Sequence, residues 1–344
     1  MRAIVAHAAK DLRIEEVATP DMGPNEIRVR LAFGGICGSD LHYYNHGGFG
    51  AVRLREPMIL GHEISGTVEA VGASANRLKV GDRVAVSPSR PCNHCRYCLE
   101  GHQNQCLDMR FYGSAMRFPH VQGAFREQLV CDETQAHVVP DHLSLGEAAM
   151  AEPLSVCLHA VRRAGSLTGK RVLVTGCGPI GALTVLAARR AGAVEIVVTD
   201  IAERALDFAL TIGADRAVNV SAGAEALAEY RPDKGYFDVT FEASGAEAAV
   251  RSAIEATRPG GVLVQLGLGG GDMTLPMQAI TAKELELRGT FRFHEEFGQA
   301  IAFMAKGLID VKPLISSTAP LADAVAAFQL ANDRSRAMKV QIAF

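Results

Sequence analysis

Four cysteines stand close together in this chain and constrain how the segment around them can fold. Cys92, Cys95, Cys98 and Cys106 lie in the spacing C-x2-C-x2-C-x7-C, and the chain holds only eight cysteines in all. The surrounding segment, PCNHCRYCLEGHQNQC, is polar and has too few apolar residues to fold by burial. Four thiolates at such spacing can bind one zinc ion tetrahedrally, and structural zinc contributes roughly 10–16 kcal/mol in small peptides. The spacing therefore predicts a structural zinc site with no open coordination position.

Two other interpretations of these cysteines are weaker. Bacterial ferredoxin motifs run C-x2-C-x2-C-x3-C and continue with proline, whereas the last gap here is seven residues and Leu107 follows. Disulfides are disfavoured because the first residues, MRAIVAHAAKDLRIEE, contain no secretory apolar core or cleavage site. We therefore expect reduced thiols and a cytoplasmic protein.

Length, composition and charge narrow the class of protein. A chain of 344 residues predicts two domains, and 48% hydrophobic with 21% charged residues is typical of globular proteins. The net charge is −3 with no basic run, which argues against nucleic acid as a partner. The longest apolar stretch, 172–188, is interrupted by Thr175, glycines and Pro179, which argues against a membrane span.

The pattern of apolar residues changes along the chain. The first part reads as short, half-buried antiparallel strands separated by turns, such as the one at 26–33. Further on, strand-like runs such as RVLVT (171–175) alternate with helical ones, which predicts a parallel sheet covered on both faces. We therefore expect an α/β protein. A β-rich domain at 1–150, completed by 291–344, accompanies a doubly wound Rossmann-type domain at 151–290.

A glycine-rich loop directly after RVLVT predicts a dinucleotide site. In the motif G-x-G-x-x-G, Gly176 makes a tight turn, Gly178 lets a pyrophosphate approach the backbone, and Gly181 allows close packing of helix and strand. Pro179 suits a first helical turn, and free N–H groups at a helix N-terminus bind phosphates. The residues assigned to cofactor binding here are Gly176, Gly178, Pro179, Ile180 and Gly181.

An acidic residue at the end of the next strand indicates which dinucleotide is bound. Asp200 can accept hydrogen bonds from the adenosine ribose and repels a 2′-phosphate, which favours NAD over NADP. An N-cap role for Asp200 is compatible with this interpretation. Arg204 would weaken the exclusion of NADP. Leu266, Gly267 and Leu268, at the end of a later strand, complete the predicted cofactor contacts.

Further candidate metal ligands stand outside the cysteine cluster. Cys37 lies in GGICGSDLH, His62 and Glu63 lie in LGHEISG, and Glu152 lies in MAEPLSV. Each alone has an ordinary structural explanation, because single cysteines are commonly core residues. Together with the cysteine cluster, the glycine loop and the closing strands, however, these motifs resemble the zinc-dependent medium-chain dehydrogenase/reductase family over essentially the full chain.

The resemblance implies a GroES-like catalytic domain for the β-rich part and two zinc ions per chain. By this likeness, Cys37, His62 and Glu63 carry a catalytic zinc with one open position. Many alcohol dehydrogenases of the family have a second cysteine where this chain has Glu152, and that difference is similar to the polyol dehydrogenase branch. There the equivalent glutamate hydrogen-bonds the zinc-bound water or substrate. Which of the two glutamates ligates zinc stays open.

The resemblance also implies a reaction. Zinc acidifies a bound hydroxyl group, hydride passes from the carbinol carbon to NAD, and the released proton leaves through a relay. Ser39 and His42 match the hydroxyl and imidazole of that relay, although His42 also reads as a surface histidine. Asp40 is a candidate for orienting a metal ligand.

Besides Glu152, four residues are predicted to contact the substrate. Tyr43 and Arg292 match positions that contact the sugar chain in sorbitol-type dehydrogenases, but Phe293 stands where those enzymes usually have a tyrosine. The loop HYYNHGGFGAVRLREPMILGHE is similar to that of the L-idonate 5-dehydrogenase subfamily. Its Arg53 and Arg55 would bind the carboxylate of a sugar acid, or are solvated loop charges.

Several functions remain in competition. The predicted activity is NAD-dependent oxidation of a secondary alcohol on a sugar acid or polyol, with L-idonate as the first substrate to test. Sorbitol, xylitol and threonine are the alternative substrates. A cofactor-binding structural protein without catalysis is the non-enzyme alternative, and an electron-transfer protein is the third. Relatives in the family suggest a homotetramer or homodimer.

Overall fold

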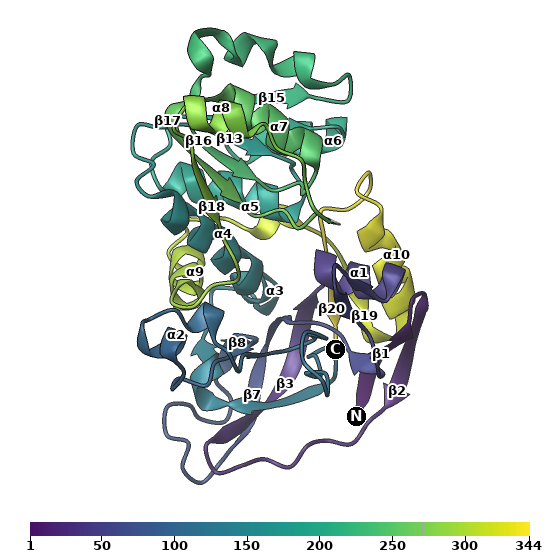
Figure 1. Cartoon of the computed structure of the whole chain (residues 1–344). Helices are drawn as coiled ribbons and strands as arrows, with labels where there is room; N and C mark the ends of the chain where they lie inside the picture. Colours follow the sequence, from purple (N-terminus) through teal and green to yellow (C-terminus); the bar gives the residue numbers. More distant parts are fainter. Residues whose placement is uncertain (270) are drawn as a thin grey trace. The chain divides into compact units, whose positions relative to one another are not determined.

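The computed structural model describes residues 1–269 and 271–344 (Figure 1). The chain divides into two compact units. Unit 1 comprises Met1–Glu152, Phe297–Gly307 and Leu314–Phe344, and unit 2 comprises Pro153–Glu296 and Leu308–Pro313.

Unit 1 is built on a seven-stranded sheet. The strand order is β12-β8-β7-β3-β20-β19, and β11 also pairs with β3. All neighbours are antiparallel except β19 and β20, which run parallel. The strands are β3 (Glu26–Gly35), β7 (Glu63–Val71), β8 (Arg83–Val86), β11 (Gln128–Asp132), β12 (Ala136–Val138), β19 (Ile315–Pro320) and β20 (Lys339–Ala343).

Strand β3 forms because its sequence alternates. Ile27, Val29 and Leu31 point into a core shared with the neighbouring strands, whereas Arg28 and Arg30 are only partly buried or exposed. This period of two is what a half-buried strand requires. The unit also has smaller sheets. One contains β1 (Arg2–Ala8), β2 (Asp11–Glu16) and β6 (Met58–Ile59). Another pairs β4 (Gly48–Phe49) with β5 (Val52–Arg53), and a further one pairs β9 (Ser89–Arg90) with β10 (Arg110–Phe111).

The helices of unit 1 are short. Helix α1 ends at Gly47, whose φ of 66° is the left-handed conformation that favours glycine. Helix α10 packs Phe328 against Tyr44 and Phe125 in a second apolar core. The helices are α1 (Gly38–His46), α2 (Arg96–Leu99), α3 (Leu145–Ala149) and α10 (Ala324–Asn332), with 3-10 turns at Gln103–Gln105, Glu133–Gln135 and Leu321–Asp323. Helix α4 (Ala151–Ala164) begins in unit 1 and continues in unit 2, and α9 (Glu296–Ala305) lies almost wholly in unit 1.

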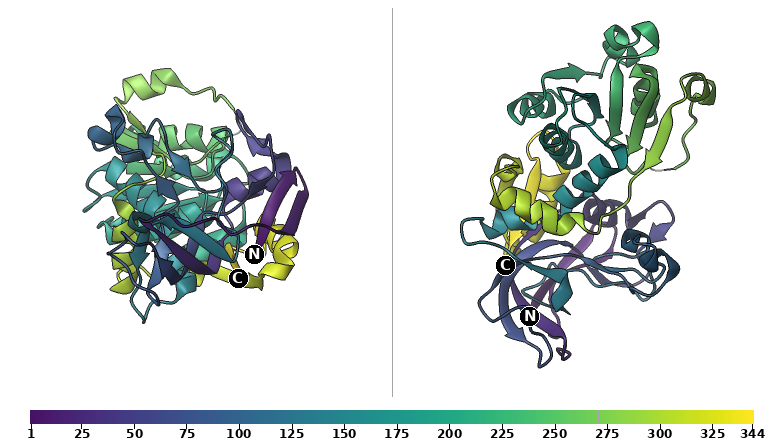
Figure 2. Two further views of the ribbon diagram at one scale, coloured as in Figure 1. Left: turned by 90° about the horizontal axis from the view of Figure 1, so that it is seen from below. Right: turned by 90° about the vertical axis from the view of Figure 1, so that its left-hand side faces the viewer.

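Unit 2 is a doubly wound sheet. Its six strands are all parallel and lie in the order β15-β14-β13-β16-β17-β18. The chain adds strands on one side from β13 to β15 and on the other side from β16 to β18, so the strand order reverses between β13 and β16. The helices lie on both faces of the sheet (Figure 2). The strands are β13 (Arg171–Thr175), β14 (Glu195–Asp200), β15 (Arg216–Asn219), β16 (Phe237–Glu242), β17 (Thr257–Gln265) and β18 (Glu286–Gly289).

The remaining elements of unit 2 connect these strands. The helices are α5 (Pro179–Arg190), α6 (Glu203–Thr211), α7 (Glu247–Ala256) and α8 (Met277–Ala282), with 3-10 turns at Ala224–Tyr230, Pro232–Lys234 and Lys312–Leu314. The buried strand residues are mostly β-branched or leucine, as expected for a sheet covered on both faces. The predicted fold class, a Rossmann-type domain with a β-rich domain, is therefore confirmed. Within the described residues no helix combines the length and apolar character needed to cross a bilayer.

Candidate active site

Three candidate metal ligands meet in unit 1. Cys37 follows strand β3, and His62 and Glu63 stand at the start of β7. The two strands pair so that Gly35 faces Glu63, which brings Cys37 beside them. The ligand atoms of Cys37, His62 and Glu63 lie within 4.8 Å of one another. Gly35 is required here, because a Cβ on it would lie 2.0 Å from Oε2 of Glu63.

Asp40 connects the two segments that carry these ligands. Its Oδ2 accepts a hydrogen bond from the backbone N–H of Cys37 at 3.0 Å, and its Oδ1 accepts one from Gly61 at 3.0 Å. Its Oδ1 also lies 3.8 Å from Nδ1 of His62, and its side chain is fully buried. These contacts support the orienting role predicted for Asp40.

Lys339 is a member of the cluster that sequence analysis missed. Its Nζ lies 2.8 Å from both carboxylate oxygens of Glu63 and donates to the carbonyl of Ile36 at 3.1 Å. Lys339 is only 2% exposed. The available signal was a lysine inside the largely apolar closing strand MKVQIAF, a position that is buried unless the strand lies at an edge.

The cluster gathers several groups that can become anions around one cation, Lys339. Burial, followed by the charge of Glu63, raises the pKa of the Cys37 thiol to about 11. Burial raises the pKa of the Glu152 carboxyl to about 8; the charges of Glu63 and Cys37 raise it too, and His62 opposes them. Burial alone would lower the pKa of Lys339, but the Glu63 and Cys37 charges outweigh it and raise that pKa. A buried site of this kind favours a cation.

The donor set fits zinc. One thiolate, one imidazole and one carboxylate are the ligand types of catalytic zinc sites, which keep a fourth position open. Zinc–ligand bonds of about 2.0–2.3 Å place ligand atoms roughly 3.3–3.8 Å apart in a tetrahedron, a spacing that lies within the 4.8 Å limit found here. In addition, the buried Nδ1 of His62 has no hydrogen-bond partner among the described residues, so this ring keeps unused donor or acceptor capacity.

Glu152 lies beside the three ligands without belonging to their set. It stands in the first turn of α4, is 5% exposed, and interacts electrostatically with His62, Glu63 and Cys37. A glutamate held next to the metal position in this way can bind water or a substrate hydroxyl there.

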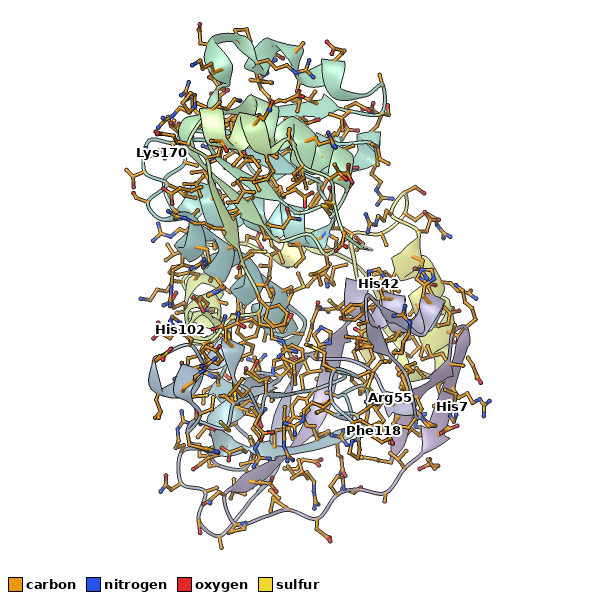
Figure 3. The ribbon with its side chains drawn as sticks, in the orientation of Figure 1. His7, His42, Arg55, His102, Phe118 and Lys170 are labelled. Atoms are coloured by element: carbon orange, nitrogen blue, oxygen red, sulfur yellow. The ribbon has the colours of Figure 1, made fainter. Side chains whose placement is uncertain are left out.

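The predicted relay residues both lie on helix α1. The Ser39 side chain hydrogen-bonds Cys37. His42 lies at the surface (Figure 3), and its ring is 5.8 Å from that of Phe49 in a tilted arrangement. The part of the imidazole that is covered, together with the positive charges of His46 and Arg334, lowers the pKa of His42. One end of the predicted relay thus touches a candidate ligand and the other reaches the surface.

The predicted substrate residues occupy different surroundings. Tyr43 is 1% exposed, and its hydroxyl oxygen accepts a hydrogen bond from the backbone N–H of Ala115 at 2.9 Å. Arg292, in unit 2, has a φ of 54° and stacks on the ring of Phe291.

The two loop arginines have different contacts. Arg53 is exposed and donates to the carbonyl of Val52 at 2.9 Å. The guanidinium of Arg55 lies over the ring of Phe118 at 4.3 Å (Figure 3). A substrate carboxylate would have to compete with that stacking, and the contact predicted for these arginines stays a prediction.

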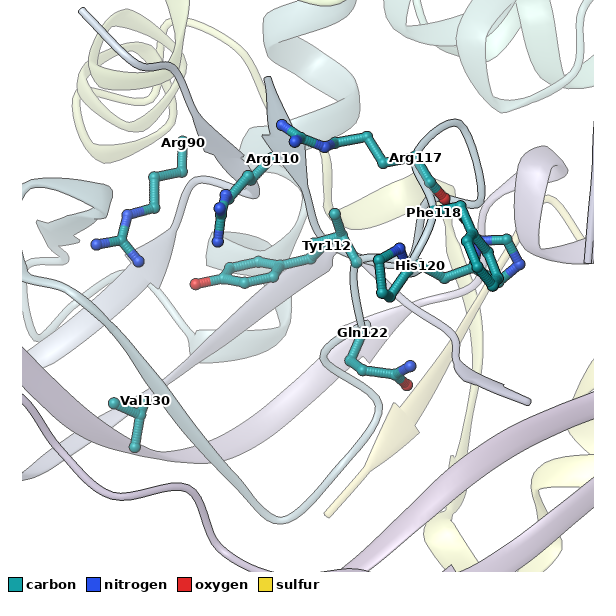
Figure 4. Close-up of a pocket in the computed structure, with 10 residues that line it drawn as sticks. Arg90, Arg110, Tyr112, Arg117, Phe118, His120, Gln122 and Val130 are labelled. Carbon is teal, nitrogen blue, oxygen red and sulfur yellow. Dashed lines mark hydrogen bonds between the residues drawn. The ribbon is translucent and has the colours of Figure 1, made fainter. Parts of the chain in front are cut away.

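A separate pocket of about 440 Å³ lies in unit 1 (Figure 4). Arg90, Arg110, Arg117, Tyr112 and His120 are among the residues that line it. Two of its arginines already face carboxylates: Arg90 lies near Glu26 and Asp132, and Arg117 pairs with Asp108. The pocket does not include the candidate zinc ligands, so we do not assign it to catalysis.

The four clustered cysteines converge in the lobe between β9 and β10. Their sulfur atoms lie within 4.8 Å of one another, and Sγ of Cys95 lies 3.6 Å from Sγ of Cys98. Backbone N–H groups of Cys95 and Asp108 donate to the sulfurs of Cys92 and Cys106 at 3.3 Å. All eight cysteines are free. In a tetrahedral site with Zn–S bonds of about 2.3 Å, neighbouring sulfur atoms lie about 3.8 Å apart. The sulfur spacing of the lobe therefore fits zinc rather than a disulfide.

In unit 2 the glycine loop has the geometry that its motif predicts. Gly176 has a φ of 84°, and a Cβ on it would lie 2.9 Å from the side chain of Ser244. Within the part of the chain that the structure describes, a Cβ on Gly178 would meet nothing within 4 Å, whereas one on Gly181 would lie 1.9 Å from the carbonyl oxygen of Gly176. The loop therefore leaves space for a phosphate at Gly178, at the N-terminus of α5.

Asp200 ends β14 beside this loop. Its Oδ2 accepts from the backbone N–H of Cys177 at 2.7 Å, and its Oδ1 accepts from Ile201 and Ala202 at 2.8 and 3.0 Å. These bonds fix the carboxylate and leave about one lone pair, on Oδ2, for a ribose hydroxyl. Arg204 is exposed on α6. Leu266 and Gly267 both donate backbone N–H groups to the carbonyl of Glu242 at 2.8 Å, and Leu268 is 67% exposed.

Comparison with known proteins agrees with this geometry. The Alcohol dehydrogenase GroES-like domain family matches residues 23–141, and the Zinc-binding dehydrogenase family matches residues 179–306. L-idonate 5-dehydrogenase (NAD(P)(+)) of Escherichia coli (strain K12) is 44% identical over 95% of this chain and 94% of its own. Sorbitol dehydrogenase of Homo sapiens is 39% identical over 95% of this chain and 91% of its own. The crystal structure of L-idonate 5-dehydrogenase from Escherichia coli K-12 has a TM-score of 0.96 at 42% identity, and the match covers 100% of this chain and 98% of that one.

Proposed function

Because the chain belongs to the zinc-dependent medium-chain dehydrogenase/reductase family, we propose that it oxidises a secondary alcohol of a sugar acid or polyol with NAD, and that L-idonate is its substrate. The product of that reaction is 5-ketogluconate. The observation that carries the proposal is the buried cluster of Cys37, His62 and Glu63 with Glu152 beside it.

We assign two zinc ions to each chain. Cys37, His62 and Glu63 would hold the catalytic ion, and the four cysteines of the lobe would hold the structural one. The catalytic zinc, when bound, supplies a Lewis acid that makes a substrate hydroxyl more acidic. The lobe offers four sulfur ligands and no open position, so its contribution is to stability.

The residues around the catalytic site would move the proton that the alcohol loses. Glu152, whose pKa burial raises to about 8, can hold a hydrogen bond to a substrate hydroxyl in either protonation state. Ser39, bonded to Cys37, and exposed His42 on the same helix would pass the proton to solvent. NAD, when bound, accepts the hydride from the carbinol carbon.

NAD is assigned rather than NADP because of Asp200. Its carboxylate is fixed beside the glycine loop by three backbone hydrogen bonds and cannot swing away. A 2′-phosphate on the adenosine ribose would meet that negative charge. Arg204 on the neighbouring helix is exposed and would reduce the penalty.

L-idonate is placed first for two reasons. The E. coli L-idonate 5-dehydrogenase is 44% identical, against 39% for human sorbitol dehydrogenase. In addition, Phe293 lacks the hydroxyl that sorbitol-type enzymes place at this position, and Arg53 and Arg55 offer cations for a carboxylate.

The test is NADH formation from L-idonate, sorbitol, xylitol and threonine by the zinc-loaded protein. We expect the highest kcat/KM with L-idonate and loss of activity after a chelator removes the metal. Much faster turnover of sorbitol or xylitol would contradict the sugar-acid assignment and favour a polyol dehydrogenase. Two thiols of unit 1 provide a matched pair of variants. Cys37→Ser should remove activity, whereas Cys131→Ser, on the buried face of β11, should keep it.

A further inference from the structure

A buried carboxylate in unit 2 has no cation. Glu242 is the last residue of β16 and is 0% exposed. Asp238, at the other end of the same strand, pairs with Arg171 and Arg258. Throughout 1–269 and 271–344, by contrast, Glu242 forms no ion pair with a lysine, arginine or histidine, although an unpaired buried charge is costly.

Hydrogen-bond donors surround Glu242 instead. Oε1 accepts from the backbone N–H of Ser244 at 2.8 Å, from its hydroxyl, and from Oγ1 of Thr175 at 3.3 Å. Oε2 accepts from Nε2 of Gln265 at 2.6 Å and from the backbone N–H of Gly245 at 3.0 Å. Five donors on two oxygens suit an ionised carboxylate, which only accepts.

These bonds join the carboxyl ends of three adjacent strands. Thr175 ends β13, Glu242 ends β16 and Gln265 ends β17. Gln265 also donates to the carbonyl of Gly267 at 2.9 Å, which connects the carboxylate to the segment after β17. The strand order reverses between β13 and β16, and dinucleotides bind at the carboxyl ends of the strands beside such a reversal.

One segment that Glu242 holds contacts the glycine loop through Ser244, and the other, at Gly267 and Leu268, packs against Gly245. A Cβ on Gly176 would lie 2.9 Å from the Cβ of Ser244 and 3.0 Å from its backbone. A Cβ on Gly267 would lie 2.1 Å from the backbone nitrogen of Gly245, and one on Gly245 would lie 2.8 Å from the carbonyl oxygen of Leu268. A small displacement of Ser244 or Gly267 would therefore move the walls of the phosphate site.

We propose that Glu242 is a positioning residue of the dinucleotide site: it holds segments 244–245 and 266–268 against the glycine loop in the shape that binds the pyrophosphate and the nicotinamide half of NAD. This inference rests on the proposed function. The negative charge of Glu242 does not repel the pyrophosphate strongly, because five hydrogen-bond donors already share that charge.

Glu242→Gln tests the inference because it keeps the shape and changes the chemistry. One carboxylate oxygen becomes an NH2 group, which donates hydrogen bonds instead of accepting them. Since both oxygens of Glu242 now accept, the NH2 group would face hydrogen-bond donors in either orientation of the amide. We expect the dissociation constant of NADH to rise at least tenfold, measured by titration of NADH fluorescence on the full zinc-loaded chain. We also expect the KM for NAD to rise far more than kcat falls.

Asp238→Asn is the matched control. It removes the other carboxylate of the same strand, which is partly buried and lies at the end remote from the glycine loop. It should lower the melting temperature and leave the NADH dissociation constant within twofold of wild type. A purely structural role for Glu242 would make the two variants alike.

A second variant covers the case in which Glu242→Gln does not fold. Gln265→Leu removes only the bonds to Oε2 of Glu242 and to the carbonyl of Gly267, and should weaken NADH binding several-fold. Wild-type NADH affinity in folded Glu242→Gln or in Gln265→Leu would overturn the inference, as would equal weakening by Asp238→Asn. Failure of the wild-type chain to bind NADH would instead overturn the proposed function on which it rests.

Discussion

Removal of Lys339 should destabilise unit 1 chiefly when the catalytic metal is absent. Lys339→Met leaves the carboxylate of Glu63 without its cation, although the two side chains are only 3% and 1% exposed. Bound zinc would supply a replacement charge next to Glu63. The chelated protein has no such replacement, so it should bear the full loss.

The size of the effect follows from burial. Removing one partner of a buried ion pair costs about 3–5 kcal/mol, and one kcal/mol shifts the melting temperature of a domain of unit 1's size by about 2–4 °C. We therefore expect chelated Lys339→Met to melt roughly 10 °C below chelated wild type. The zinc-loaded pair should differ by less than half of that.

The assay is thermal unfolding of wild type, Lys339→Met and the double variant Glu63→Gln/Lys339→Met, each with zinc and with a chelator. The double variant should recover most of the lost stability, because it leaves no unpaired charge in the site. A chelated Lys339→Met that melts within about 2 °C of wild type would refute the reasoning. A double variant no more stable than the single one would do the same.

Three further predictions concern other parts of the chain. Cys98→Ser should lower the zinc content from two ions per chain to one, as measured by elemental analysis, because three sulfurs do not close the lobe; an unchanged content would contradict the lobe assignment. Asp200→Gly should raise kcat/KM for NADP relative to NAD, and a constant ratio would show that this carboxylate does not select the cofactor. Burial would raise the pKa of Asp238, but hydrogen bonds from the backbone and side chain of Arg171 and from Arg258 outweigh it and hold that pKa at about 2. Since this is below the ordinary value of 3.8, Asp238→Asn should lower the free energy of unfolding by about 2 kcal/mol at neutral pH. That difference should be lost as the pH falls from 4 through 2, and a constant difference in urea titrations across this range would count against it.

The parts of the fold that the sequence could predict depend on neighbours along the chain. Strand β13 has the bounds predicted from RVLVT, and α5 begins at Pro179 as expected, because turn glycines and a period-two pattern act locally. The cysteine lobe is also local, since four ligands within a short segment need no distant contact. The roles of the three glycines also follow from the motif alone: Gly176 makes the turn, Gly178 leaves open space and Gly181 allows close packing.

The rest of the site depends on tertiary contacts that leave no local pattern. Lys339 meets Glu63 across 276 residues of sequence, and nothing near either residue indicates the other. The stacking of Arg55 on Phe118 and the bond from Ala115 to the hydroxyl of Tyr43 likewise arise from packing of distant loops. Glu242 reads in the sequence only as a polar end to a strand, and its role follows from what surrounds it.

Anomalous X-ray scattering at the zinc absorption edge, from crystals of fully active protein, tests the central claim most directly. The account predicts two zinc peaks per chain, one among the four cysteines of the lobe and one bound by Cys37, His62 and Glu63. A single peak in the lobe, with Cys37 and His62 free of metal in active crystals, would contradict it.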